Sequence, residues 1–191
     1  MRRIIVGISG ASGAIYGVHT LRALRGVPDL EVHLVMSPAG KRTLIEETDW
    51  SVDAVEAMAD VVHPHVDIGA ALASGSFRTM GMIVAPCSVK TLSEIAHSHS
   101  GNLLTRAADV CLKERRRVVL LLRETPLHLG HLDLMAQATR CGAIVMPPVP
   151  AFYTRPSTLD EMIDHTVGKA LDLFDLPHGL VKRWKDPGGD A

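Results

Sequence analysis

The 191-residue sequence predicts a single α/β domain built on a doubly wound, mainly parallel β-sheet. Short β-branched runs alternate with helical stretches along the chain, which is the pattern of repeated βα units. The runs 82–85 (MIVA) and 117–122 (RVVLLL) are strongly apolar. Strands with so few polar residues are buried on both faces, as in parallel sheets that lie between two layers of helices.

The first half of the pattern begins with a strand at 3–6, where the sequence reads RIIV. A glycine-rich turn then leads into a helix at 14–25. A second strand, EVHLVM at 31–36, ends at a serine, and the stretch 39–47 continues as a helix.

The central strand is expected at 82–85, followed by a turn at Pro86 and a short helix at 91–96. A longer helix at 103–114 carries a basic C-terminal end, which suits the helix dipole. It leads into the apolar strand 117–122.

The remaining elements are a helix at 131–139, a strand at 143–146 that ends at two prolines, and an amphipathic helix at 159–174. Residues 1–184 are expected to form the single domain. The tail 185–191, with two glycines and a proline, is expected to fray.

The composition excludes several function classes. The formal net charge of −1 gives no electrostatic reason to expect a nucleic acid or an anionic membrane as partner. No apolar run approaches the roughly 20 residues that span a bilayer. Three cysteines at irregular spacing do not indicate a disulfide framework, so a cytoplasmic location is expected. The ten histidines include HxH pairs, but none has a recognised metal-ligand spacing, and no metal site is predicted.

The first candidate site is the segment GISGASGAIYG at 7–17. Ligands of doubly wound sheets bind beyond the carboxyl ends of the strands, where this segment lies. Gly10 and Gly13 allow close backbone approach, and Ser12 stands where a helix begins, so its hydroxyl can meet an anion. A plain strand-to-helix turn would not need the serines. The segment fits neither the Walker A pattern nor GxGxxG, which argues against a nucleoside triphosphate or NAD as the ligand.

A second helix start, APCSVKTLSEIA at 85–96, repeats this arrangement. Ser88 can cap the helix, and Lys90 and Thr91 add donors at its N-terminus. Two such helix starts in one crevice favour a phosphorylated cofactor over an empty capped helix. We interpret Cys87 as a small buried thiol and not as a nucleophile.

Charged residues after the strand at 117–122 are costly unless paired or used, which favours a function for Arg123 and Glu124. Glu47 reads by itself as a surface carboxylate. Tyr153, in a loop bracketed by prolines, could offer its hydroxyl to a phosphate or its ring to a flavin.

An ordered set of motifs resembles the UbiX-type flavin prenyltransferases, a family that includes proteins labelled phenylacrylic or hydroxyarylic acid decarboxylase subunits. The likeness runs from residue 3 to about residue 184. The motifs are GISGASGAIYG, ETD, SGSF, PCSVKTLS, RAADVCLKERR, RETPL, GAIVMPPVPAFY and KRW.

The resemblance implies a Rossmann-like, flavodoxin-like fold that binds FMN and assembles as a homo-oligomer, typically a dodecamer. It implies transfer of a dimethylallyl group from dimethylallyl monophosphate to N5 and C6 of reduced FMN, with no metal. The product, prenylated FMN, would serve a UbiD-type decarboxylase. Whether ubiquinone synthesis or aromatic acid degradation is served stays open, as does a pyrophosphate donor.

The resemblance also assigns roles to individual residues. Flavin-binding positions would be Gly10, Ala11, Ser12, Ser37, Ser88, Val89, Lys90, Thr91 and Arg123. Positions that hold the prenyl phosphate would be Lys113, Arg123, Tyr153 and Lys169, with Lys113 and Arg123 acting across a subunit contact. Catalytic positions would be Ser12, Glu47, Glu124 and the C-terminal aromatic Trp184.

The sequence departs from the family pattern in two places, and three functions other than flavin prenylation stay open. Position 169 is Lys where relatives commonly have Arg, and the region 50–73 looks short. A flavin-dependent cysteine decarboxylase would carry an Asn in a PASANT-like segment where this chain reads PCSVKT. A non-catalytic FMN carrier would not need the charged residues Glu47, Lys113, Glu124 and Lys169. A direct aromatic acid decarboxylase is the third alternative.

Overall fold

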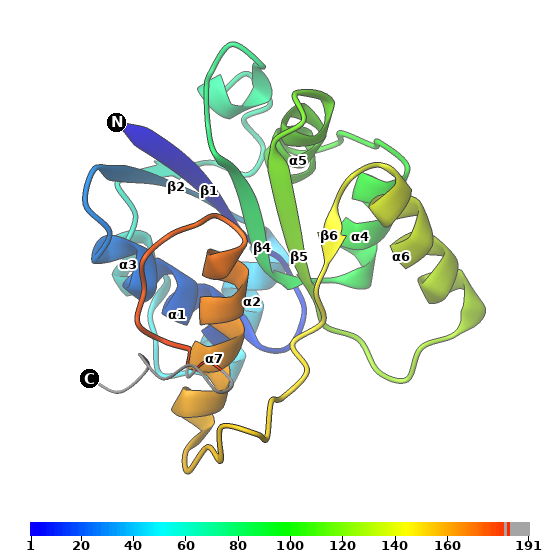
Figure 1. Cartoon of the computed structure of the whole chain (residues 1–191). Helices are drawn as coiled ribbons and strands as arrows, with labels where there is room; N and C mark the ends of the chain where they lie inside the picture. The colour runs from blue at the N-terminus through cyan, green and yellow to red at the C-terminus, as the bar shows by residue number, and fades with distance from the viewer. Residues whose placement is uncertain (182, 184–191) are drawn as a thin grey trace.

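The computed structural model describes residues 1–181 and 183 and contains one six-stranded sheet (Figure 1). All neighbouring strands are parallel, and their order is β3-β2-β1-β4-β5-β6. This is the order of the classical doubly wound dinucleotide-binding sheet. The expected α/β fold with a parallel sheet is therefore confirmed.

The strands are β1 (Arg2–Ile8), β2 (Leu30–Met36), β3 (Val61–His63), β4 (Gly81–Cys87), β5 (Arg117–Leu122) and β6 (Ile144–Val145). The helices are α1 (Ala14–Arg25), α2 (Pro38–Glu47), α3 (Val52–Glu56), α4 (Val89–Ala96), α5 (Leu103–Lys113), α6 (Leu129–Arg140) and α7 (Leu159–Asp172). A 3₁₀ turn, η1, spans Ala71–Ala73.

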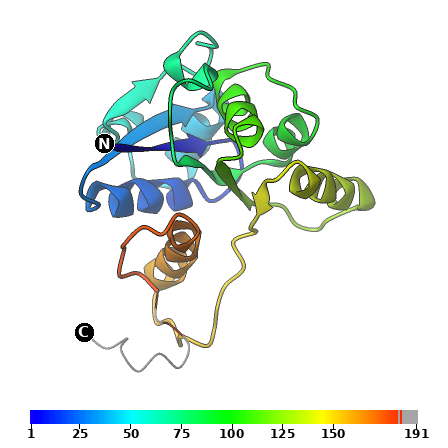
Figure 2. The ribbon, with the colours of Figure 1, turned by 45° about the horizontal axis from the view of Figure 1, so that its top comes forward.

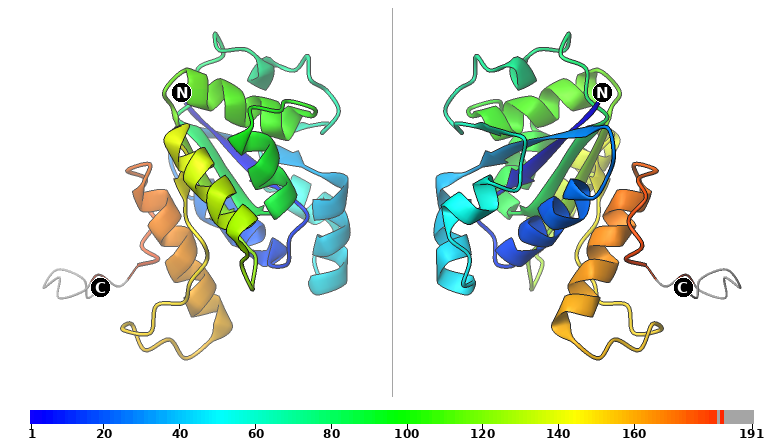
Figure 3. Two further views of the ribbon diagram at one scale, coloured as in Figure 1. Left: turned by 90° about the vertical axis from the view of Figure 1, so that its right-hand side faces the viewer. Right: turned by 90° about the vertical axis from the view of Figure 1, so that its left-hand side faces the viewer.

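Helices cover both faces of the sheet (Figure 2), and a hydrophobic core lies beneath each helix layer. Alternate residues of β1 divide between them: Ile4, Val6 and Ile8 face the core under α1 and α7, and Ile5 faces the core under α4, α5 and α6. The central strands are buried throughout, as the apolar runs in the sequence predict. The segment between β6 and α7 extends away from the sheet (Figures 1 and 3).

One strand and one α-helix were not expected from the sequence, and neither was the 3₁₀ turn η1. β3 has only three residues and stands at the edge of the sheet, with Val62 40% exposed, so it shows no buried-strand pattern. α3 has five residues, too few for a helical period. Both lie within the region 50–73.

The turn expected at Pro86 was placed two residues too early. β4 continues through Pro86 to Cys87, with a register shift against β5 in this stretch. The carbonyl of Pro86 accepts hydrogen bonds from the backbone N–H and hydroxyl of Ser9, at 3.2 and 2.9 Å. These bonds tie the carboxyl ends of β1 and β4 together, and the chain turns at Ser88.

Candidate functional site

A cavity of about 470 Å³ opens at the carboxyl ends of the strands, where the helices after β1 and β4 pass to opposite faces of the sheet. This is the crevice at which doubly wound sheets bind ligands, and its volume is typical of a small-molecule site. Seven residues with an expected role line it: Gly10, Ser37, Ser88, Val89, Lys90, Thr91 and Glu124. The other lining residues are Pro38, Ala39, His65, Glu94, Asn102 and Leu104.

The N-terminus of α4 forms one wall of this cavity. Ser88 caps the helix by accepting a hydrogen bond from the backbone N–H of Thr91 at 3.2 Å. Ser88 is itself fixed, because its N–H donates to the hydroxyl of Ser9 at 2.8 Å. Ser9 is 1% exposed. The first turn of α4 therefore presents backbone N–H groups from a rigid support, which suits an anionic ligand.

Gly10 forms the opposite wall, where the loop after β1 passes close to α2. A Cβ atom at Gly10 would lie 2.3 Å from the Cβ of Ala39 and 3.2 Å from its carbonyl carbon. Real Cβ atoms do not come so close, so only glycine lets the two segments meet. A second cap lies beside it, since Ser37 accepts from the N–H of Gly40 at 2.9 Å.

We expect Gly10→Ala to lower the free energy of unfolding by about 1–3 kcal/mol, the usual cost of overpacking, and to weaken ligand binding in the cavity. Chemical denaturation and a binding titration measure the two effects. Gly26→Ala is the matched control, because the nearest atom to its added Cβ would be 3.7 Å away. Equal effects of the two substitutions would contradict the close approach at Gly10.

A carboxylate lies at the N-terminus of α1, next to this loop. Glu47 accepts a hydrogen bond from the N–H of Gly13 at 2.7 Å and another from the side chain of Ser12. Gly13 directs its N–H there from the left-handed region, with φ of 95°. Burial raises the pKa of Glu47, but these hydrogen bonds, one from Ala14 N–H and the charge of Arg123 outweigh it, so the pKa is lowered. The structure thus brings Ser12, Glu47 and Arg123 together.

Arg123 and Glu124 follow β5 directly. The N–H of Arg123 donates to the carbonyl of Cys87 at 3.0 Å, which fixes this segment against the end of β4. Glu124 accepts from the N–H of Thr125 at 3.0 Å and lines the cavity. Both residues are exposed, and the charge of Arg123 acts on Glu47.

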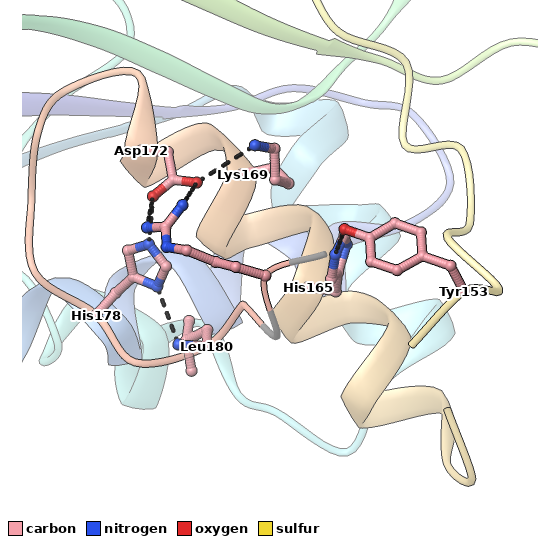
Figure 4. A network of polar contacts seen from close by, with 7 residues as sticks. Tyr153, His165, Lys169, Asp172, His178 and Leu180 are labelled. Carbon is pink, nitrogen blue, oxygen red and sulfur yellow. Dashed lines mark hydrogen bonds and ion pairs between the residues drawn. The ribbon is translucent and has the colours of Figure 1, made fainter. Parts of the chain in front are cut away.

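Tyr153 and Lys169 form a separate group on and beside α7 (Figure 4). The hydroxyl of Tyr153 lies 3.0 Å from Nε2 of His165. Lys169 contacts Asp172 at 3.4 Å, and Asp172 also pairs with His178. Burial raises the pKa of Asp172, but its hydrogen bonds with Arg183, His178 and Lys169 hold it far below its usual range.

Lys113 lies on the side of the sheet where the strands begin, opposite their carboxyl ends. It ends α5 and pairs with Glu114, before β5 begins, whereas Arg123 comes after β5 ends. The six residues of β5 separate its two ends by roughly 20 Å. Within one chain, therefore, Lys113 does not join the residues around the cavity. Trp184 lies outside the described residues.

Three polar residues of the cavity were not predicted from the sequence: His65, Glu94 and Asn102. Glu94 pairs with Lys90 at 2.6 Å and accepts from Asn102 at 3.3 Å, so it holds two donors at the helix starts. The i,i+4 spacing of Lys90 and Glu94 was the available signal. His65 follows the edge strand β3, which has no clear sequence pattern. Its position beside the cavity could therefore not be predicted.

Two of the three cysteines, Cys87 and Cys111, are buried. Burial raises the pKa of the Cys87 thiol and raises that of Cys111 to about 11, which confirms Cys87 as a buried thiol. No cluster of three or more potential metal ligands occurs among the described residues. In the same part of the chain, no helix is both long and apolar enough to cross a bilayer.

Known proteins match this chain along nearly its full length. The model of the Flavoprotein family matches residues 1–184. The flavin prenyltransferase UbiX of Escherichia coli K12 is 61% identical over 187 residues, which cover 97% of this chain and 99% of that protein.

Two solved structures are also similar. AnUbiX, in complex with FMN and dimethylallyl pyrophosphate, has a TM-score of 0.94 and 50% identity, covering 97% of this chain and 98% of that one. A dodecameric FMN-dependent UbiX-like decarboxylase from Escherichia coli O157:H7 has a TM-score of 0.94 and 48% identity, covering 96% and 100%. The sequence motifs, the fold and these likenesses agree, and the chain belongs to the UbiX family of flavin prenyltransferases.

Proposed function

We propose that this protein transfers a dimethylallyl group from dimethylallyl monophosphate to N5 and C6 of reduced FMN, forming prenylated FMN for a UbiD-type decarboxylase. The observation that carries the proposal is the cavity at the strand ends, which is lined by the N-termini of α2, α4 and α5. Seven of its lining residues are ones that the family resemblance assigns to flavin or to the reacting centre. The 61% identity to a flavin prenyltransferase supports the same reaction.

The residues present fit a flavin phosphate compound. Gly10, Ser37 and Ser88 to Thr91 would hold FMN, because capped helix starts and close backbone approach favour an anionic group. Ala11, Ser12 and Arg123 complete the proposed set. When bound, the flavin would supply the nucleophilic ring atoms that the reaction requires.

The chain's own residues would perform three tasks. Arg123, Lys113, Lys169 and Tyr153 would stabilise the phosphate that leaves the prenyl donor. Glu47, held ionised by its hydrogen bonds, would accept the proton that leaves C6 when the new carbon–carbon bond forms. Ser12 would orient Glu47, Glu124 would act at the mouth of the cavity, and Trp184 would close the site.

Assembly is part of this proposal. Lys113 lies before the amino end of β5 and Arg123 follows its carboxyl end, so the two could act on one phosphate only if they came from different chains. A homo-oligomer, with the dodecamer described for the Escherichia coli O157:H7 relative as the expected form, would provide such contacts. We also propose a cytoplasmic location, since the three cysteines are free thiols.

The test is anaerobic incubation of the purified protein with reduced FMN and dimethylallyl monophosphate, followed by mass spectrometry of the released flavin. A flavin heavier by one five-carbon prenyl unit is expected. Unmodified FMN with this donor would exclude monophosphate as substrate. If the pyrophosphate also failed, the proposal would be wrong and an FMN carrier or a decarboxylase would take its place.

A further inference from the structure

A buried histidine on α7 contacts the tyrosine to which the proposed function assigns the prenyl phosphate. His165 is 9% exposed, and its Nε2 lies 3.0 Å from the hydroxyl of Tyr153. The two rings meet edge to face, with centroids 5.5 Å apart and an interplanar angle of 82°. Figure 4 shows the tyrosine ring reaching toward α7 from the loop before it.

The side chain of Tyr153 is only partly covered by the rest of the chain. The tyrosine is 47% exposed, and its neighbour Phe152 is 72% exposed. Two prolines, Pro150 and Pro156, limit the backbone of the loop, but they do not fix a side-chain rotamer. A polar contact to a rigid helix is therefore well placed to select one orientation of the phenol.

His165 lies on a helix that packs into the core. It belongs to a helix whose buried residues include Val167, Ala170 and Leu171 of the core under α1. The preceding residue, Asp164, bonds to the buried His19 of α1 at 2.7 Å. The imidazole is thus held by the packing of two helices, while its partner is held by a loop.

Burial and a neighbouring cation favour the neutral form of the His165 imidazole. Burial lowers the pKa of His165, and the positive charge of Lys169, one turn along α7, lowers it further, although Asp172 raises it. A neutral ring carries one N–H and one acceptor nitrogen. In the tautomer with hydrogen on Nε2, the ring donates to the tyrosine oxygen, and the phenol proton remains available to an incoming phosphate oxygen.

We propose that His165 is a positioning residue, which holds the Tyr153 hydroxyl toward the phosphate of the prenyl donor beside Lys169. This inference rests on the proposed function and adds to it a residue that does not itself touch the donor. Lys169 and His165 are four residues apart and so share one face of α7. The tyrosine that His165 holds and the ammonium group of Lys169 would then address the same anion.

The test compares His165→Phe, which keeps an aromatic ring and removes the nitrogen, with His165→Gln, which retains a polar group. Calorimetric titration of the oxidised FMN complex with dimethylallyl monophosphate measures donor affinity without turnover, and steady-state rates separate KM from kcat. We expect His165→Phe to weaken donor binding and raise KM about five- to tenfold, the value of one neutral hydrogen bond, with kcat and FMN affinity nearly unchanged. His165→Gln should recover part of the loss.

A double-substitution cycle with Tyr153→Phe distinguishes positioning from general stabilisation. If His165 acts through the tyrosine hydroxyl, His165→Phe should have no further effect on donor affinity in the Tyr153→Phe background. His97→Phe, at the exposed C-terminal end of α4, is the control for the substitution type. Multiplying effects in the double variant, or unchanged donor affinity in His165→Phe, would overturn the inference. Failure of the unsubstituted protein to prenylate FMN would instead contradict the proposed function.

Discussion

Glu47→Gln is expected to lower the rate at which prenylated FMN is formed by about 10²–10⁴-fold, the usual contribution of a general base. The carboxylate stands at the N-terminus of α1 and receives hydrogen bonds from Ser12, Gly13 and Ala14. Glutamine has the same shape and keeps one accepting oxygen, but it cannot take up a proton at neutral pH. FMN binding should change little, so a flavin titration next to the rate measurement separates binding from chemistry.

Glu46→Gln is the matched control, because it makes the same change at the adjacent position. Glu46 is exposed and pairs with Arg42 at 2.8 Å on the surface of α2. Surface pairs of this kind contribute little, so this variant should behave as the unsubstituted protein. If both variants had equal rates, or if Glu47→Gln lost FMN together with activity, Glu47 would not be the proton acceptor.

The pH dependence follows from the same contacts. The pKa of Glu47 lies below that of an ordinary glutamate, so its carboxylate remains ionised through the neutral range. The activity that depends on this group should therefore be present above the usual glutamate range and be lost only at lower pH, as the carboxylate protonates. A rate that already fell between pH 8 and pH 6 would require another titrating group.

The parallel sheet could be predicted because its central strands are buried on both faces. The hydrophobic runs of β4 and β5 carry this information in their composition alone, and the glycine and serine residues at the strand ends then locate the cavity. β3 could not be found in this way. It is a short edge strand, and its residues gain their structure from pairing with β2 rather than from their own pattern.

The contacts that fix the site were also beyond local sequence reasoning. Ser9 supports Ser88 across 79 positions of the chain, and Glu47 reaches Gly13 across 34. Such bonds depend on which strand ends the topology brings together. By itself, the sequence indicated only a surface carboxylate at Glu47; the resemblance assigns it to the reacting centre, and the structure adds its hydrogen bonds with Ser12 and Gly13.

Substitution of Lys113 is the second change with a large expected effect. The position of this residue also tests whether one site is built from two chains. It lies at the amino end of β5, roughly 20 Å from the carboxyl end that precedes Arg123, yet the family resemblance assigns both residues to the donor phosphate. Lys113→Ala alone should lower kcat/KM for the prenyl donor by about 10²-fold or more, through loss of a cation at the leaving phosphate. Its ion-pair partner Glu114 is exposed, so folding should not suffer.

Mixing the two inactive variants decides whether one active site draws on two chains. Lys113→Ala subunits keep Glu47, and Glu47→Gln subunits keep Lys113. If each site takes these residues from different subunits, random mixing after mild dissociation and reassembly should restore about a quarter of the sites. Lys113→Ala mixed with Lys113→Ala,Glu47→Gln double-variant subunits is the control, and it should stay inactive because no chain supplies the lysine. If both residues served one site within the same chain, every mixed site would lack one of them. A mixture as inactive as its components, with reassembly verified by native mass spectrometry, would therefore contradict the shared site.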